Sequence, residues 1–345
     1  MSKIAIDVMG GDNAPVEIIK GCIDALPEVD STLVLVGKED IIKEELKKYT
    51  YDSSKIEIKN ATETIEMCES PVTAVRTKKD SSMVVALNLV KNNEVDGMVS
   101  AGSSGALLTG ATFVVGRIKG VARPALAPFI PTKKGSSLLI DAGANVDCKP
   151  EYLVQFARMG TVYVRQSKNI QNPKVGLVNI GAESEKGNQL TKEAYQLLSE
   201  SKDINFVGNL EPRDIPDGEI DIIVCDGFTG NVILKFMEGF GSWIKNLLVG
   251  EFKKNILTMA AAGLMHSAIK KLTGLFAVAK KGGAPFLGVK GLVVKTHGSS
   301  KAAEVKATII QTDGFIKVKL IENLKKEFEK ENAKIAKTNQ VAQEN

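Results

Sequence analysis

The chain has 345 residues, of which 43% are hydrophobic and 25% are charged, an ordinary globular composition with enough apolar material for a large core. Its 45 Lys and Arg residues barely exceed its 41 Asp and Glu residues, and aromatic residues make up only 5%, so the composition gives no general case for nucleic-acid binding. The four cysteines are far apart, which excludes a CxxC metal or redox pair and favours buried reduced thiols. Because no basic segment with a long apolar run opens the sequence and no uncharged run reaches membrane-spanning length, we expect a cytosolic chain.

One pattern recurs six times along the chain: a short β-branched apolar run, a glycine-rich polar loop, and then residues with helical periodicity. The six runs begin near residues 3, 95, 136, 174, 220 and 291. This alternation predicts a largely parallel sheet, and continuous apolar runs such as LLI and DIIVC indicate helices on both faces, a three-layer α/β/α sandwich. Since ligands bind beyond the carboxyl ends of such strands, the six polar loops together are the expected site.

No composition break marks a linker between domains. The sequence therefore predicts one α/β/α catalytic domain over residues 1–330, with an amphipathic helical insertion over residues 240–283 that interrupts the alternation. Residues 331–345 are predicted to form a polar tail.

The first two polar loops are candidates for binding an anion. Backbone N–H groups at the start of a helix can hold phosphate, but a tight turn capped by Asp12 or Asn13, or a capping serine, explains the same residues. The loop residues are Gly10, Gly11, Asp12 and Asn13 in the first loop and Ser100, Gly102, Ser103, Ser104 and Gly105 in the second. Neither GxGxxG nor GxxxxGK[ST] occurs, so a classical dinucleotide or ATP site is not expected.

Charged residues near the loops give further candidates. Arg123 and Lys186 are cations beside proline or glycine loops, although an isolated cation is more often a solvated surface charge. Three aspartates at or near strand ends, Asp7, Asp141 and Asp226, either invite a divalent cation or hydrogen-bond loop N–H groups, and no metal is predicted.

Only two histidines occur, and neither a GxSxG elbow nor an HExxH helix is present, so a hydrolytic triad and a zinc site are not expected. His297 follows the last predicted strand, where it can donate to an oxyanion or move a proton; the alternative is a loop histidine that caps its own backbone.

Residues 255–272 have the pattern of a basic amphipathic helix, with lysines opposite an apolar face. The apolar face includes Leu257, Ala261, Leu264, Met265 and Ala268, and the polar face includes Lys270 and Lys271. Such a helix lies on an anionic membrane or binds an acidic partner, but a core-facing or dimer-interface helix has the same pattern.

Several longer motifs span almost the whole chain in order. They are IAIDVMGGDNAP, SAGSSGAL, GVARPALAP, DAGANVDCKPEYLVQFARMG, GLVNIGAESEKGN, NFVGNLEPRDI, DGFTGNVILKFMEG, GGAPFLG and THGSSKAAEVKA. Together they resemble the phosphate acyltransferase family of bacterial phospholipid synthesis. One departure is that the family usually reads SAGNTGAL, so the asparagine amide is missing at Ser103.

This resemblance implies a cofactor-free transfer of a fatty acyl group from acyl carrier protein to inorganic phosphate on a phosphotransacetylase-like fold. It also implies a homodimer in loose contact with the inner face of the cell membrane, directly or through a membrane-bound glycerol-3-phosphate acyltransferase. We expect phosphate to attack the thioester directly, with Lys186 holding phosphate and His297 and Asn231 stabilising the oxyanion. Asn145, Asn188 and Gly227 complete the predicted substrate-binding loops.

Three other functions remain open at this point. A phosphate acyltransferase that uses short-chain coenzyme A thioesters needs the same chemistry, and donor preference distinguishes it. A nicotinamide-dependent dehydrogenase lacks its fingerprint here. A non-catalytic scaffold that recruits carrier protein to the membrane would leave the six loops without a purpose.

Overall fold

The structure, a computed structural model, describes residues 2–265, 267 and 282–344. Within this range the chain forms two compact units, and each contains its own sheet. The first unit comprises residues 1–127, 158–171 and 281–345, and the second comprises residues 128–157 and 172–280. The sequence predicts one domain over residues 1–330, whereas the structure forms two units, and one of the points at which the chain passes between them lies inside the helix Pro150–Lys168, which has no linker composition.

The first unit contains a seven-stranded sheet in the order β3-β2-β1-β4-β12-β11-β5. Its strands are β1 (Lys3–Asp7), β2 (Thr32–Gly37), β3 (Ile56–Asn60), β4 (Gly97–Ser100), β5 (Ala125–Leu126), β11 (Ala284–Leu287) and β12 (Leu292–Lys295). The five strands from β3 to β12 are parallel, whereas β11 is antiparallel to both of its neighbours. Strands β1, β2, β4 and β12 are almost completely buried, as expected for apolar strands covered by helices on both faces.

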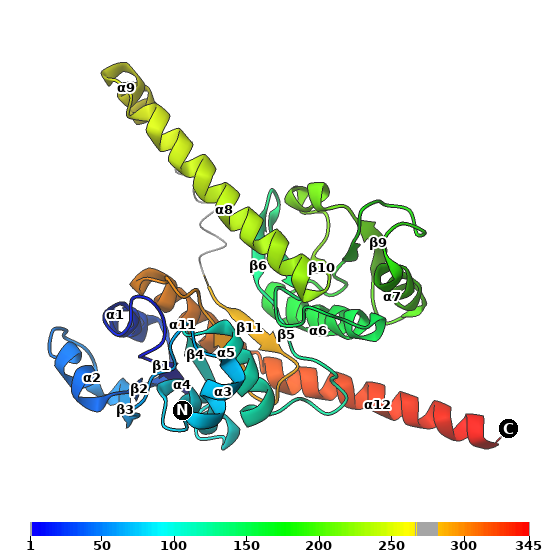
Figure 1. Ribbon diagram of the computed structural model, residues 1–345, viewed down its shortest axis with the longest axis horizontal. Coiled ribbons are helices and arrows are strands. Elements are labelled where there is room, and N and C mark those ends of the chain that lie inside the picture. The colour runs from blue at the N-terminus through cyan, green and yellow to red at the C-terminus, as the bar shows by residue number, and fades with distance from the viewer. Residues whose placement is uncertain (1, 266, 268–281, 345) are drawn as a thin grey trace. The chain divides into compact units, whose positions relative to one another are not determined.

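Helices from both ends of the chain cover this sheet. They are α1 (Val16–Ala25), α2 (Glu39–Leu46), α3 (Pro71–Thr77), α4 (Ser82–Lys91), α5 (Ser104–Gly110), the end of α6 (Pro150–Lys168), α11 (Ala302–Lys317) and α12 (Leu320–Glu344). Helix α1, blue in Figure 1, packs against α11, orange, and a Cβ atom on Gly21 would lie only 2.6 Å from the Val305 side chain. The predicted polar tail, residues 331–345, continues α12 as far as Glu344.

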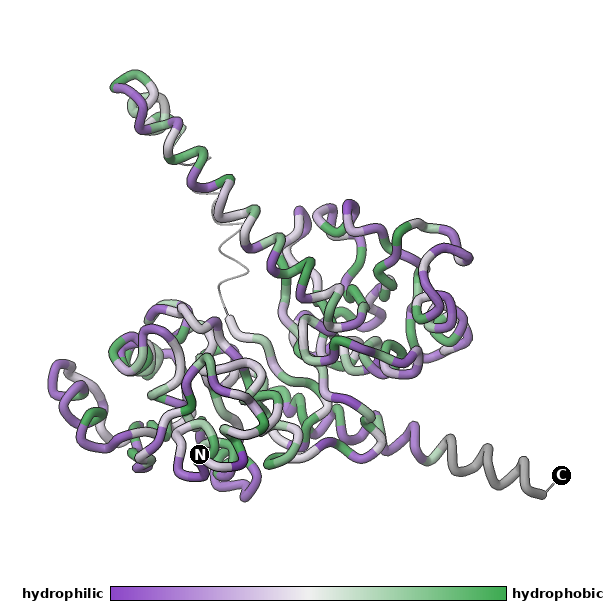
Figure 2. Tube along the Cα trace, viewed as in Figure 1, coloured by the Kyte–Doolittle hydropathy of each residue, from purple (hydrophilic) through white to green (hydrophobic). Residues whose placement is uncertain are grey.

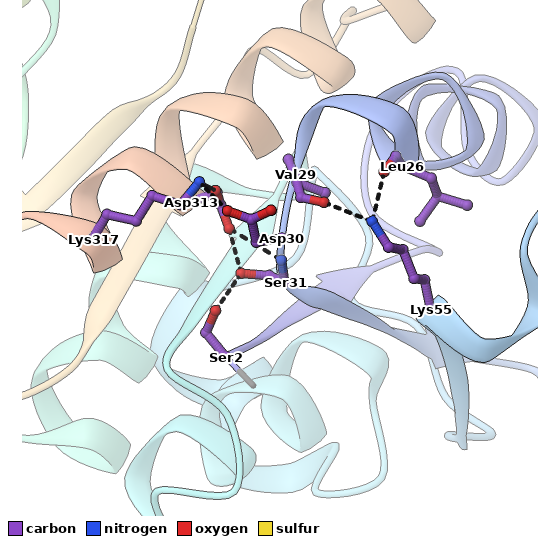
Figure 3. Close-up of polar contacts among 8 residues, drawn as sticks. All are labelled: Ser2, Leu26, Val29, Asp30, Ser31, Lys55, Asp313 and Lys317. Atoms are coloured by element: carbon purple, nitrogen blue, oxygen red, sulfur yellow. Dashed lines mark hydrogen bonds and ion pairs between the residues drawn. The ribbon is translucent and has the colours of Figure 1, made fainter.

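A polar network joins the amino end of β2 to α11, as Figure 3 shows. Asp313 is buried; it accepts hydrogen bonds from the backbone N–H and the hydroxyl of Ser31, and it pairs with Lys317 at 2.7 Å. Lys317 also pairs with the exposed Asp30 at 2.7 Å, and Ser2 hydrogen-bonds Ser31. These contacts lie at the amino ends of the parallel strands, on the side of the sheet opposite their carboxyl ends.

The second unit contains a five-stranded sheet in the order β6-β7-β10-β8-β9. Its strands are β6 (Phe129–Thr132), β7 (Gly135–Ile140), β8 (Val175–Val178), β9 (Phe206–Leu210) and β10 (Ile222–Val224), and only the β6–β7 pair is antiparallel. Its helices are the start of α6, α7 (Gln189–Glu200), α8 (Gly227–Phe252) and α9 (Ile256–Leu264). The largely parallel α/β fold predicted from the sequence is confirmed, and all six predicted strands are present.

The predicted insertion over residues 240–283 begins in the middle of α8, which is one continuous helix from residue 227. Figure 2 shows hydrophobic residues recurring along α8. On α9 and just beyond it, Leu257, Leu264 and Met265 are exposed. Ala268, Lys270 and Lys271 lie outside the described residues, and no helix among the described residues is long and apolar enough to cross a membrane.

Candidate functional site

In the first unit, three neighbouring strands end in a buried polar cluster. Asp7, Ser100 and Lys295 stand side by side at the carboxyl ends of β1, β4 and β12. The Asp7 carboxylate accepts hydrogen bonds from the hydroxyls of Ser82 and Ser100, both at 2.6 Å, and Lys295 donates to the carbonyl oxygen of Ala101 at 3.3 Å. Burial raises the pKa of the Asp7 carboxyl above its ordinary value, and the two serine hydroxyls and the charge of Lys295 oppose that rise.

This cluster fixes the loop that follows β4. The Ser100 oxygen accepts a hydrogen bond from the Gly102 N–H at 3.0 Å, so the Asp7 carboxylate acts on that backbone through one hydroxyl. Ser103 then caps α5, where its hydroxyl accepts from Ala106 N at 3.5 Å, while Ser104 is exposed. A Cβ atom on Gly105 would lie 2.7 Å from Pro71, which explains a glycine at this position.

The loop after β1 packs against the loop after β12. Asp12 N donates to Gly298 O at 2.8 Å, and the Asn13 side-chain amide donates to Ser299 O and Ser300 O at 3.0 and 3.2 Å. A Cβ atom on Gly10 would lie 2.5 Å from the Asp7 carboxylate, and Gly11 has φ +102°. The amide of Asn13 therefore joins two loops.

His297 lies exposed in the loop after β12. Its Nδ1 accepts a hydrogen bond from Ser299 N at 3.2 Å and lies 2.8 Å from the Ser299 hydroxyl, so the proton of the neutral ring is assigned to Nε2. Arg123 does not join these loops. It precedes β5, and the pairing of Ala125 with Leu287 places it toward the amino ends of the parallel strands, away from His297.

In the second unit, Asp141 organises the loop after β7. This carboxylate is fully buried, and it accepts hydrogen bonds from Ala144 N at 3.1 Å and from the N–H and side-chain amide of Asn145 at 2.7 and 2.9 Å. Asn145 O in turn accepts from Gly227 N at 2.7 Å, which joins this loop to the start of α8.

The start of α8 completes this cluster. Asp226 caps the helix and accepts from Thr229 N and the Thr229 hydroxyl, both at 2.8 Å. Asn231 is exposed on the next turn, and a Cβ atom on Gly143 would lie 3.4 Å from its side chain. The structure thus brings together five predicted residues: Asp141, Asn145, Asp226, Gly227 and Asn231.

A third loop, between β8 and α7, carries Lys186. The Lys186 side chain is exposed, but its carbonyl oxygen accepts from the side-chain amide of Asn179 at 3.1 Å, and Asn209 donates in the same way to Glu183 O at 2.8 Å. Asn188, also exposed, caps α7 through Thr191 N at 3.0 Å. Because β7, β10 and β8 are adjacent parallel strands, all three loops lie at one edge of this sheet.

Several residues of these clusters were not predicted from the sequence, among them Ser82, Asn179, Asn209 and Lys295. Only Lys295 left a signal, because it is a lysine inside an apolar strand run, where it is now found buried. Among the described residues, no group of three or more His, Cys, Asp or Glu side chains is arranged to hold a metal ion.

Comparison with known proteins identifies relatives of the chain. A sequence profile for the family described as "Fatty acid synthesis protein" matches residues 2–323. A phosphate acyltransferase from Clostridium perfringens is 50% identical over 331 residues, which cover 96% of this chain and 98% of the relative. One from Acetivibrio thermocellus is 51% identical over 326 residues, covering 94% and 96%.

Solved structures show the same fold at low identity. A phosphotransacetylase from Streptococcus pyogenes has a TM-score of 0.60 at 16% identity and covers 91% of this chain and 94% of its own. A branched-chain phosphotransacylase from Enterococcus faecalis has a TM-score of 0.55 at 13% identity, covering 94% and 99%.

Proposed function

Because the chain belongs to the fatty acid synthesis protein family, whose relatives at about 50% identity are phosphate acyltransferases, we propose that it transfers a fatty acyl group from acyl carrier protein to inorganic phosphate. The broader statement, that this chain is an acyltransferase of fatty acid and phospholipid synthesis, follows from the family itself. The acyl carrier protein donor is the new part of the proposal.

In the proposed reaction, a phosphate oxygen attacks the thioester carbonyl carbon and forms the acyl phosphate C–O bond. The C–S bond breaks, and the carrier leaves as a thiolate that takes up the proton lost by hydrogen phosphate. The observation that carries this proposal is the exposed Lys186 cation on a loop that two asparagine amides hold, at the same sheet edge as the α8 N-terminus. A cation carried on an anchored loop suits a phosphate anion.

Direct transfer is favoured over a cysteine acyl-enzyme in this cluster. Burial, with the nearby Asp141 and Asp226 carboxylates, raises the pKa of the Cys148 thiol to about 12, and burial raises the pKa of the Cys225 thiol well above its ordinary value. Both groups are then neutral thiols near pH 7, and the thiolate is the nucleophile.

The test follows thiol release and hydroxylamine-trappable acyl phosphate with purified protein, phosphate and palmitoyl-acyl carrier protein, and in parallel with palmitoyl coenzyme A. Phosphate-dependent product from the carrier thioester supports the proposal. Product from coenzyme A alone favours a different donor, and product from neither rejects the function. Lys186→Ala should raise the KM for phosphate at least tenfold, while Lys192→Ala, an exposed lysine on α7, is the matched control.

We further propose that the acyl phosphate feeds acylation of glycerol 3-phosphate, and that the protein works in the cytoplasm as a homodimer in peripheral contact with the membrane. The exposed Leu257, Leu264 and Met265 support a membrane or carrier contact near α9. Leu264→Glu should weaken binding to anionic liposomes and spare activity on the soluble carrier thioester. If liposome binding survives, α9 does not make the contact.

A further inference from the structure

Exposed apolar side chains flank the polar loops of the second unit. Apart from those on α8, on α9 and at Met265 just beyond α9, the large apolar side chains described as exposed in this unit are Val146, Ile180 and Val207. Val146 and Ile180 are 61% and 79% exposed, and Phe228, at the start of α8, is 63% exposed. These last three, called here the apolar rim, all follow the carboxyl ends of β7, β8 and β10.

Each rim residue directly follows a residue of the polar clusters in the chain. Val146 follows Asn145 and Phe228 follows Gly227, and the Gly227 N–H···O=C Asn145 hydrogen bond of 2.7 Å holds these two segments together. Ile180 follows Asn179, whose side-chain oxygen accepts from the Ile180 N–H at 2.9 Å. The backbone beneath each rim side chain is therefore anchored.

Isolated exposed apolar residues are common and need no explanation. Here, however, exposed apolar groups occur on two loops and on the start of α8, at one edge of one sheet, and Lys186 and Asn231 are carried by one of these loops and by the start of α8. An acyl thioester has a polar reacting carbonyl joined directly to an apolar chain. A binding surface for it needs polar donors and an apolar surface side by side.

We propose that the apolar rim, Val146, Ile180 and Phe228, binds the hydrocarbon of the acyl group next to the carbonyl that phosphate attacks. This inference rests on the proposed function. It assigns recognition of the acyl hydrocarbon to residues other than those proposed to bind the phosphate and the oxyanion. Because burial of methylene groups drives the contact, its contribution grows with acyl length.

The test compares acyl lengths in rim variants. For each protein, kcat/KM is measured with palmitoyl- and acetyl-acyl carrier protein at saturating phosphate, and the palmitoyl-to-acetyl ratio is taken. In Ile180→Ser and Phe228→Ser the ratio should fall about fivefold to tenfold through loss of apolar contact. Ile180→Leu should retain most of the ratio, because it keeps the apolar volume.

Val207→Ser is the matched control. Val207 is 47% exposed, but it lies near the amino end of β9, at the opposite edge of the same sheet. The palmitoyl-to-acetyl ratio of Val207→Ser should therefore stay at the wild-type value. Equal losses for both substrates in the rim variants, or an unchanged ratio, would overturn the inference.

Failure of the proposed function looks different, because the wild-type protein then makes no acyl phosphate from either donor. In that case calorimetric binding of a long-chain acyl phosphonate, compared with acetyl phosphonate, decides the inference without turnover. Loss of long-chain binding in the rim variants alone supports it, and equal binding by wild type and variants overturns it.

Discussion

Gly230 provides a sharp test of how the second unit is packed. It lies in the first turn of α8, and a Cβ atom there would be 1.9 Å from Asp141 O and 3.0 Å from the Cys225 sulfur. Since ordinary van der Waals contact begins near 3.4 Å, α8 and the loop after β7 must separate by roughly 1.5 Å to accommodate an alanine. The obstacle is backbone, so no side-chain rotation relieves it.

Gly230→Ala combines a gain and a loss. Alanine is a better helix former than glycine by about 1 kcal/mol, whereas overpacking a tight contact costs about 1–3 kcal/mol or more. We expect a net destabilisation of about 2 kcal/mol, which lowers Tm by roughly 4–8 °C. Because Asp226 caps α8 and α8 carries Asn231, the residue that we propose for stabilising the oxyanion, a displacement of this size should also lower kcat at least tenfold.

Gly239→Ala separates the clash from helix propensity. Gly239 lies in the same helix with no atom within 4 Å of its Cβ position, so alanine should leave Tm unchanged or raise it through a gain of about 0.5–1 kcal/mol. Calorimetry and the acyl phosphate assay on both variants test the reasoning. If Gly230→Ala matches Gly239→Ala in stability, the close approach of α8 to the Asp141 carbonyl is refuted.

Three further predictions concern the polar networks. Lys317→Met should destabilise the protein by about 1–2 kcal/mol in urea unfolding, because it leaves the buried Asp313 carboxylate on the same helix without its cation. Asp30→Asn removes only the exposed partner of Lys317 and should change the stability little, so equal effects of the two substitutions would contradict this. The pKa of Asp7 is raised by burial, so its contribution to stability is present below the pKa of the unfolded carboxyl and is lost as the pH rises through the folded value. Asp7→Asn should therefore flatten the fall in unfolding free energy above about pH 4, and an unchanged slope would exclude Asp7 as its source. Asn209→Ala removes a hydrogen bond to the Lys186 loop, but it also removes a buried oxygen with no partner among the described atoms. Tm should therefore hardly change, while the KM for phosphate rises about threefold to tenfold. A large loss of Tm with an unchanged KM would make Asn209 purely structural.

The sequence predicted the local elements of the fold well. All six apolar runs are strands, because near-continuous β-branched segments followed by glycine loops suit only buried parallel strands. It did not predict that these strands divide into two sheets. Strand β12 pairs with β4 although most of the chain separates them, and this pairing depends on contacts that no local pattern encodes.

The candidate site residues likewise include some that the sequence predicted and some that it did not. Loop positions such as Asn145 and Gly227 could be predicted because they follow strands, and the structure brings them together. Arg123 was chosen for its charge beside a proline, but the direction of β5 places it toward the other edge of its sheet. Asn179 and Asn209 were missed because asparagines near strand ends are common in sequences, and only their hydrogen bonds to the Lys186 loop distinguish them.

The hydrogen bonds of the three strand-end aspartates indicate which polar groups remain for binding substrate. Asp7 accepts from two serine hydroxyls, Asp141 from the loop of Asn145, and Asp226 from Thr229, so each carboxylate has donors on both oxygens within its own unit. A divalent cation on any of them would displace these donors and leave N–H or hydroxyl groups unpaired at a cost of about 1–3 kcal/mol each. The carboxylates are therefore better suited to holding loops than to holding substrate. In the function that we propose, phosphate is then bound by groups that these loops present to solvent, above all Lys186 and Asn231. Changes at the aspartates should therefore act mainly on stability, whereas changes at Lys186 should act on the KM for phosphate.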